Sequence, residues 1–580
     1  MSLYRLLAGF IRQHWRPYFF SAVMLFAVAL LSVLIPRRVG HIIDELVAHR
    51  LGGVALLEQL AIVLAMGVAI YFLRVGWRLQ LFAAAYRLGV SLRTRLYEKL
   101  ATQGPGFYHG QRTGDLMARA TNDIDAIEMA AGEAMLAGFD GSMTLILVVA
   151  MMTVGIDWRL ALVALLPFPL MALAFWRISD HIHHAWHDSL GRFSKLNDHV
   201  QETLTGVRTM RALGLQARNS KELSRLAGDA AASSLTAQRW EAAFEPAVGL
   251  TLSTSAVTVL AVGGYLVWQG ELTIGALTSF SMYLGQLIWP MFAAGWVLSL
   301  LERGKAAWGR LGPILETPPS VPDDGVQGAL QPGALVFSNL SFNYPEQGTA
   351  AISGVNLTLE AGKTLGLVGP TGSGKSTLLR LLLRQYPLQL GDIRWDGVSV
   401  AEYKLDTLRN AISWVPQEPF LFSASVADNI ALVKPDATRA EIERVATLAA
   451  VHQDILRLPQ GYDTPVGEKG VSLSGGQRQR VAIARALLAD APLLLLDDAL
   501  SAVDTQTEAQ ILSHLQEARR GRTVIIVSHR LSAVADADHI AVLRHGRITE
   551  SGTHQDLVDA DAWYASQWRY QQLEASLDEL

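Results

Sequence analysis

The chain has 580 residues, too many for one ordinary soluble domain, so at least two domains are expected. Half of the residues are hydrophobic and only 18% are charged, which excludes disordered and collagen-like chains and favours a membrane protein. A formal net charge of −4 excludes the overall positive field that would hold a nucleic acid. The absence of Cys excludes disulfides, Cys-ligated metal sites and thiol nucleophiles.

Six apolar stretches in the first half are long enough to cross a bilayer, which requires about 20 mostly apolar helical residues. The first stretch is too long for the core of a signal peptide and lacks a small-residue cleavage site, so we expect it to be retained. The six stretches lie near residues 17–37, 54–76, 133–156, 158–177, 244–269 and 275–301.

The distribution of Lys and Arg orients these spans. The connection over 78–131 carries seven such residues and that over 177–242 carries nine, whereas the other connections are short and poor in them. Because positive loops stay inside, both long connections, the N-terminus and the C-terminal half are predicted to be cytoplasmic. Arg37, Arg38 and Arg50 are the exceptions, on the outer side. This arrangement indicates a multi-pass protein of a bacterial cytoplasmic (inner) membrane.

The two long connections carry apolar residues at helical spacing, which predicts helices that extend beyond the membrane. Gly110 and Gly114 flank a predicted turn in the first connection, and residues 211–220 contain a second one. Either turn could contact a soluble domain.

Three acidic residues stand in or near the spans: Glu133, Asp140 and Glu245. Charge within a membrane often marks a transport pathway, so these residues are candidates for a cation-attracting cavity. The alternative, which the sequence favours for each, is an interfacial position or a structural hydrogen bond.

A stretch rich in Pro and Asp after residue 316 separates the apolar half from a soluble-looking second half. We expect a transmembrane domain over 1–316, a linker over 317–332 and a nucleotide-binding domain over 333–580. The predicted fold class is an α-helical six-span membrane domain followed by an α/β P-loop domain.

A P-loop follows the apolar strand at 365–368 and precedes an apolar helix, the order that phosphate binding requires. Glycines let backbone N–H groups wrap the phosphates, Lys375 supplies a cation to the β- and γ-phosphates, and Ser376 offers a hydroxyl to Mg²⁺. The predicted ATP-binding residues here are Gly369, Thr371, Gly372, Ser373, Gly374, Lys375, Ser376 and Thr377.

Two further elements point to the same chemistry. Asp497 ends an uninterrupted apolar strand, where parallel sheets collect their ligands, and so is predicted to hold Mg²⁺. Ser474 and two glycines open a helix and offer a second anion-binding surface, although the P-loop is already complete. Two phosphate surfaces on one chain suggest a dimer that shares nucleotides. The second surface comprises Leu473, Ser474, Gly475, Gly476 and Gln477.

An ordered set of motifs resembles the ATP-binding cassette (ABC) superfamily: the P-loop, Gln417, Leu473 to Gln477, Asp497, residues 501–504 and His529. With six spans before it, essentially the whole chain resembles an exporter half-transporter. The resemblance implies that Leu473 to Gln477 act on the partner's ATP. It also implies roles for five single residues: Tyr344 stacks on adenine, Gln417 senses Mg²⁺ and the membrane domain, His529 contacts the γ-phosphate, Glu468 contacts the intracellular helices, and Asp504 contacts the other subunit.

One position departs from the family pattern. The family's general base is a Glu directly after the Mg²⁺ aspartate, and this chain has Asp498 there. A carboxylate one methylene shorter can misplace the attacking water, which predicts a degenerate site on this P-loop. The alternative is that Asp498 still works as the base.

These features are similar to the MdlA-type half of heterodimeric bacterial multidrug exporters. We therefore expect ATP-driven export of hydrophobic or amphipathic small molecules, with ATP and Mg²⁺ as cofactors. The expected partners are a Glu-bearing second half-transporter, a lipid bilayer and a small amphipathic substrate, but no nucleic acid. A lipid or lipopeptide flippase and a homodimeric exporter remain alternatives. A signalling or DNA-repair ATPase could use the same nucleotide motifs but would not need six spans. A non-transporting receptor or scaffold is a further alternative, in which ATP only locks the dimer.

Overall fold

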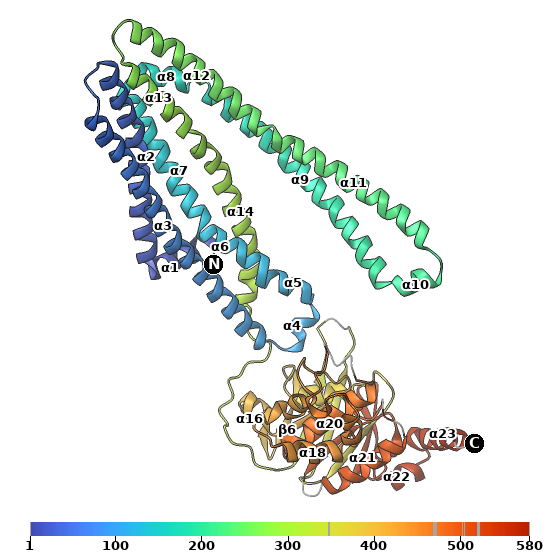
Figure 1. Ribbon diagram of the computed structural model, residues 1–580. Coiled ribbons are helices and arrows are strands. Elements are labelled where there is room, and N and C mark those ends of the chain that lie inside the picture. Colours follow the sequence, from blue (N-terminus) through green and yellow to red (C-terminus); the bar gives the residue numbers. More distant parts are fainter. Residues whose placement is uncertain are drawn as a thin grey trace. The chain divides into compact units, whose positions relative to one another are not determined.

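The computed structural model describes residues 2–345, 348–467, 473–501, 503, 505–518 and 522–578 (Figure 1). The chain forms two compact units. One contains Met1–Lys99 and Gly114–Thr317, and the other contains Leu100–Thr113 and Pro318–Leu580. A short piece of the first long connection therefore packs with the C-terminal unit.

Among the described residues, the first unit holds six helical segments long and apolar enough to cross a membrane, which confirms the prediction. Several of them extend well beyond the apolar stretch, as the helical spacing predicts. The six segments are Trp15–Val47, Val54–Ala101, Thr113–Ile156, Trp158–Thr205, Gln216–Trp268 and Ile274–Glu316.

Some of these segments are divided by short irregular or π-helical turns. The helices, including two π-helical turns labelled η, are α1 (Leu3–Gln13), α2 (Trp15–Val47), α3 (Val54–Ala101), α5 (Thr113–Ala118), η1 (Arg119–Asp123), α6 (Ile124–Ala131), α7 (Glu133–Ala150), η2 (Met151–Ile156), α8 (Trp158–Leu165), α9 (Phe168–Thr205), α10 (Val207–Ala212), α11 (Gln216–Ala242), α12 (Phe244–Trp268), α13 (Ile274–Gln286) and α14 (Ile288–Glu316).

The second cytoplasmic connection is a helical hairpin in which α9 and α11 lie side by side (Figure 1). The turn expected within 211–220 is confined to residues 213–215, between α10 and α11. Gly214 adopts a φ of 67°, a left-handed conformation that a residue without Cβ enters without strain.

The helices of the membrane unit enclose an apolar core to which several spans contribute. Its fully buried members include Met152, Leu160, Val259, Phe280 and Tyr283. Asp157 starts α8 by accepting hydrogen bonds from the backbone N–H groups of Arg159 and Leu160, at 2.8 and 3.1 Å. These bonds satisfy donors that a helix start otherwise leaves unpaired.

The second unit is built on two sheets. In the larger one, β3, β6, β7, β8 and β9 run parallel, while β10 is antiparallel, and the strand order is β10-β9-β3-β8-β7-β6. The smaller, antiparallel sheet has the order β2-β1-β4-β5. The strands are β1 (Leu335–Phe342), β2 (Ile352–Leu359), β3 (Thr364–Val368), β4 (Leu390–Trp395), β5 (Val398–Ser399), β6 (Ile412–Val415), β7 (Leu493–Asp497), β8 (Thr523–Val527), β9 (His539–Arg544) and β10 (Arg547–Gly552).

Strands β3, β7 and β8 are buried along their whole length, which explains their uninterrupted apolar sequences. The helices of this unit are α4 (Pro105–His109), α15 (Lys375–Leu382), α16 (Leu405–Asn410), α17 (Val426–Ile430), α18 (Arg439–Leu448), α19 (His452–Leu456), α20 (Gly475–Ala489), α21 (Thr505–Ala518), α22 (His554–Asp559) and α23 (Trp563–Asp578). Short 3₁₀ turns are η3 (Val400–Glu402), η4 (Ala431–Val433), η5 (Gly461–Asp463) and η7 (Leu531–Ala533).

Candidate nucleotide site

The P-loop connects β3 to α15, as the sequence predicts. Gly369 and Gly374 have φ of 146° and 103°, which side chains with a Cβ rarely adopt. A Cβ on Gly369 would lie 2.0 Å from the carbonyl oxygen of Leu543, and one on Gly374 would lie 2.5 Å from that of Ala351. The loop therefore needs glycine at both positions, for its conformation and for space.

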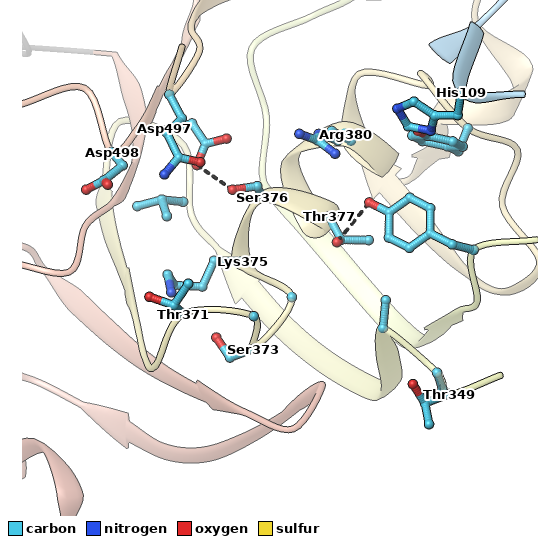
Figure 2. Close-up of a pocket in the computed structure, with 18 of the residues that line it drawn as sticks. His109, Thr349, Thr371, Ser373, Lys375, Ser376, Thr377, Arg380, Asp497 and Asp498 are labelled. Carbon is cyan, nitrogen blue, oxygen red and sulfur yellow. Dashed lines mark hydrogen bonds between the residues drawn. The ribbon is translucent and has the colours of Figure 1, made fainter. Parts of the chain in front are cut away.

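Most of the predicted ATP-binding and catalytic residues meet around one cavity of about 800 Å³ (Figure 2). The sides come from the P-loop and α15, from the ends of β7 and β8, and from the loop after β1. The predicted residues in its lining are Tyr344, Thr371, Gly372, Ser373, Gly374, Lys375, Ser376, Thr377, Gln417, Asp497, Asp498 and His529.

Lys375 begins α15 and folds back over the loop. Its Nζ donates to the carbonyl oxygens of Gly369, at 2.8 Å, and Pro370, at 3.0 Å. Burial lowers the pKa of Lys375, and the carboxylates of Asp498 and Asp497 oppose that shift. The ammonium group thus occupies the loop, where a phosphate would offer it stronger, charged acceptors.

Asp497 and Ser376 face each other across the cavity floor (Figure 2), where the Ser376 hydroxyl donates to Asp497 Oδ1 at 2.8 Å. Asp497 is 3% exposed, and burial raises its pKa, while the bond from Ser376 opposes the rise. Mg²⁺ prefers oxygen ligands, so the hydroxyl, this carboxylate and the amide of Gln417 in the same lining fit that ion.

Asp498 and His529 form a direct pair. The Nδ1–H of His529 donates to Asp498 Oδ1 at 2.7 Å, and this bond raises the pKa of His529. The carboxylate side chain is 16% exposed and the imidazole 51%. Both groups border the cavity, so each could turn to another partner there.

The backbone of Asp498 is held from several sides. Its N–H donates to the carbonyl oxygen of Val527 at 2.8 Å, and its own carbonyl accepts from Gln479 Nε2 and Ser501 Oγ, both at 3.0 Å. With φ of 50°, Asp498 also adopts a left-handed conformation. These contacts fix the position from which the Asp498 side chain starts.

Tyr344 lines the cavity from the loop after β1. Its hydroxyl is 3.1 Å from Thr377 Oγ1, and its ring packs edge-to-face on those of Phe342 and Tyr386, with centroids 5.0 and 5.3 Å away. The ring is thereby fixed at the cavity wall.

The second predicted phosphate surface, at the start of α20, is well formed but lies apart from the nucleotide cavity of this chain. Ser474 caps α20 by accepting from the backbone N–H of Gln477 at 3.2 Å, and Gln477 Oε1 accepts from the N–H of Ser474 at 3.0 Å. Among the described residues, the cavity lining includes none of Leu473 to Gln477. The structure does not bring this surface to the chain's own P-loop.

Two predicted residues, Glu468 and Asp504, lie outside the described residues.

The sequence analysis did not predict several residues of the site. Arg380 and His109 line the cavity, and Gln571 holds His529 by donating from Nε2 to its carbonyl oxygen at 2.9 Å. Arg380 stands one helical turn after Ser376, a spacing that could have revealed it. His109, on α4, is brought there only by the tertiary fold.

The acidic residues of the membrane unit differ in their surroundings. Asp140 Oδ2 accepts from Trp289 Nε1 at 2.8 Å, and the charge of Arg74 also acts on this carboxylate. Glu245 is exposed, whereas Glu133 is half-buried at the start of α7. Among the described contacts of these three residues, only Asp140 has a hydrogen bond to an aromatic side chain, that of Trp289. The Trp289 side chain is 42% exposed.

A six-span helical unit joined to a P-loop nucleotide unit defines a nucleotide-driven membrane transporter. The family model of the ABC transporter transmembrane region matches residues 18–291, and that of the ABC transporter matches residues 352–501. The chain belongs to the ABC transporter family.

Relatives and a solved structure agree with this assignment. The multidrug resistance-like ATP-binding protein MdlA of Escherichia coli is 44% identical over 100% of this chain and 98% of its own length. The probable multidrug resistance ABC transporter YheI of Bacillus subtilis is 39% identical over 99% and 98%. A bacterial Atm1-family ABC exporter solved with ATP bound is 28% identical, with a TM-score of 0.81, over 96% of this chain and 99% of that one.

The chain is therefore an ATP-driven exporter subunit whose hydrolase activity is coupled to translocation. Its six spans make it a multi-pass inner-membrane protein with a cytoplasmic nucleotide-binding domain. Exporters of this family work as dimers, so a second half-transporter completes the machine.

Proposed function

We propose that this chain is one half of a heterodimeric multidrug-type exporter, in which its own P-loop site is degenerate. Its second phosphate surface, Leu473 to Gln477, here called the signature surface, serves a competent site on a Glu-bearing partner. The observation that carries the proposal is the fixed backbone of Asp498. Contacts to Val527, Gln479 and Ser501 hold that backbone, which argues against a shift that would make up for the missing methylene.

The remaining residues receive roles from their positions around the cavity. Lys375 and the P-loop amides bind the phosphates, and Ser376, Asp497 and Gln417 hold Mg²⁺, which would neutralise phosphate charge when bound. Tyr344 stacks on the adenine. The domain division at 1–316, 317–332 and 333–580 belongs to the same proposal, as do the coupling role of Glu468 and the subunit contact of Asp504.

His529 supplies a second argument for a weak site. Its imidazole is the partner of Asp498 in this chain, so the short carboxylate is drawn toward His529 rather than toward an attacking water. A base must lie within hydrogen-bond reach of the proton it removes. A displacement of about 1 Å can reduce a rate on the order of a hundredfold.

ATP turnover by the purified chain alone in lipid tests this proposal, with Lys375→Ala as the blank. Negligible turnover that appears when a Glu-bearing half-transporter is added supports the asymmetric heterodimer. Robust turnover by the chain alone means a functional homodimer with Asp498 as a competent base, and the degenerate-site proposal is then wrong.

For the cargo we propose hydrophobic or amphipathic small molecules, since relatives over the full chain carry multidrug names. Asp140 beside the exposed ring of Trp289 offers a carboxylate and an aromatic face, which favour lipophilic cations within this class. The carboxylate of Asp140 also interacts with the charge of Arg74, so an incoming cation must compete with Arg74 for Asp140.

A lipid-type cargo is the second candidate, because a relative named a fatty acid ABC transporter in Mycobacterium bovis is 36% identical over 81% of this chain and 74% of its own length. Stimulation of ATP turnover separates the two. We expect lipophilic cations to stimulate the complete exporter and Asp140→Asn to weaken that response selectively. Stimulation by fatty acids or phospholipids alone would favour the lipid-type cargo instead.

A further inference from the structure

An apolar cavity of about 670 Å³ lies within the membrane unit. Its walls come from α1, α2, α3, α7 and α14, and α1 packs against both α2 and α14. None of its lining residues also lines the nucleotide cavity. Its volume falls in the range that small-molecule sites occupy in proteins.

The cavity lies at the depth of the cytoplasmic leaflet. Since the chain crosses six times and its nucleotide-binding domain is cytoplasmic, the N-terminus is cytoplasmic as well. α2 and α7 therefore run outward, and they line the cavity with their first turns, within 18–25 and 134–143. α14 returns to the cytoplasm and contributes Val297 and Leu301, near the inner end of its apolar stretch.

The lining of the cavity is almost entirely hydrocarbon. Among the described residues that line it, none is charged, and the hydroxyl groups belong to two Tyr and two Ser. Three of these hydroxyls already donate to backbone carbonyl oxygens, at 3.4, 3.3 and 2.6 Å: those of Tyr18, Ser21 and Ser142. A polar ligand would lose its hydrogen bonds to water on entering, so the interior suits an alkyl chain.

The cavity is continuous with the surface that faces the bilayer. Tyr4 and Met135 line it, yet they are 56% and 39% exposed. Four residues of α1, at positions 4, 7, 8 and 11, share the helix face that borders the cavity. The bilayer surrounds the spans at this depth, so a lipid chain can enter from the side.

Two arginines on α1 flank the cavity. Arg5 stands three residues before Ala8, which lines the cavity, and Arg12 stands four residues after it, so the three share one helix face. Both arginines are exposed. No Asp or Glu precedes Asp44 in the sequence. Basic residues on a helix at the cytoplasmic surface attract anionic lipid headgroups.

We propose that this cavity, here called the α1 cavity, holds an acyl chain of an anionic phospholipid from the cytoplasmic leaflet, with the headgroup phosphate at Arg5 and Arg12. The bound lipid would fill the space between α1 and the spans and so stabilise the position of α1. This site is a permanent lipid contact of the exporter and is separate from its cargo.

The acidic candidate for cargo binding supports that separation. Asp140 lies on α7, between residues that line the α1 cavity, but it does not line the cavity itself. Its carboxylate instead accepts from Trp289. A lipophilic cation thus finds no counter-charge inside the α1 cavity.

Photolabelling of the full-length chain in phosphatidylcholine vesicles tests the proposal. The probe is a phosphatidylglycerol that carries a diazirine at the end of one acyl chain, and the labelled peptides are mapped by mass spectrometry. We expect saturable labelling of α1 and of the first turns of α2 and α7. An excess of unlabelled phosphatidylglycerol should suppress it, whereas the same excess of phosphatidylcholine should not. Labelling spread evenly over the six spans would overturn the proposal.

Charge removal tests the headgroup contact. Arg5→Gln with Arg12→Gln should weaken labelling of the α1 cavity about tenfold at the same fraction of probe. The matched control is Arg87→Gln with Arg95→Gln, two exposed arginines on the cytoplasmic extension of α3, and it should leave labelling unchanged. Equal labelling in the two double variants would show that Arg5 and Arg12 do not hold the headgroup.

A filled cavity tests the acyl-chain contact. Gly138 lines the cavity, and a Cβ there would lie 3.8 Å from the side chain of Val297, an ordinary contact, so Gly138→Leu can enter without a backbone clash. This variant should lose the labelling. Gly67→Leu makes the same change on α3, at an exposed position with open space, and should keep it. Retained labelling in Gly138→Leu would place the lipid elsewhere.

A last measurement uses the unchanged chain, in case a variant fails to fold. Tetraphenylphosphonium, a lipophilic cation, is added in excess to the photolabelling reaction. We expect labelling of the α1 cavity to persist, because the cation has no counter-charge there. Loss of the labelling would assign the cavity to cargo and refute a permanent lipid. Neither result depends on ATP turnover or on a partner chain, so it is independent of the heterodimer proposal.

Discussion

The side chain at 498 differs from the family pattern by one methylene, Asp in place of Glu. Its backbone is held by hydrogen bonds, and in this structure its carboxylate accepts one from His529. Phosphoryl transfer depends mainly on positioning, so a small displacement matters more here than a change of charge.

Asp498→Glu should therefore raise ATP turnover at this chain's P-loop site by about tenfold to a hundredfold, because the longer carboxylate reaches the attacking water. Turnover by the purified chain measures the gain. Asp498→Glu combined with Lys375→Ala is the control and should remain at the blank level. No gain in the single variant would mean that another feature limits this site.

The pair of His529 and Asp498 predicts a pH dependence of stability in the nucleotide-free chain. Because the bond raises the pKa of His529, its contribution is fully present below about pH 6.5 and is lost as pH rises through the raised pKa. The imidazole is half exposed, so we expect less than about 1 kcal/mol. Thermal unfolding across this range should show the decrease, and His529→Ala should abolish it.

At the scale of elements, the contact of α2 with α13 depends on glycine at 275. Gly275→Ala would place a Cβ 1.9 Å from a backbone oxygen, so the helices must move apart, and we expect a loss of about 1–3 kcal/mol in stability. Thermal unfolding in detergent measures it. Gly285→Ala, in the same helix with open space around it, is the control and should not destabilise.

At the scale of the whole exporter, the separation of the signature surface from the cavity predicts different phenotypes for the two surfaces. Lys375→Ala should abolish nucleotide binding at one site of the dimer, whereas Ser474→Ala should impair the opposite site. Photolabelling with an ATP analogue, read separately on each chain, distinguishes the sites. Equal effects of both variants on both chains would argue against a shared heterodimer.

Much of this chain was predictable because its determinants are local. Span length follows from the thickness of the bilayer, so six apolar stretches predict six crossing segments. The P-loop, Asp497 and Ser474 follow from motifs that act within one strand, turn or helix start. The departure at Asp498 is visible from the sequence for the same reason.

Tertiary structure alone decided the contacts between residues far apart in the chain. Gln479 and Gln571 hold Asp498 and His529, and His109 reaches the nucleotide cavity from a membrane connection. Pro36 is visible in the sequence as an interruption of α2, but Gln286, whose amide donates to the carbonyl oxygen of Ser32, is not visible as its partner. Hydropathy and local motifs determine which elements form and which chemistry they carry, whereas packing decides which polar atoms meet, since that depends on how distant helices and strands come together.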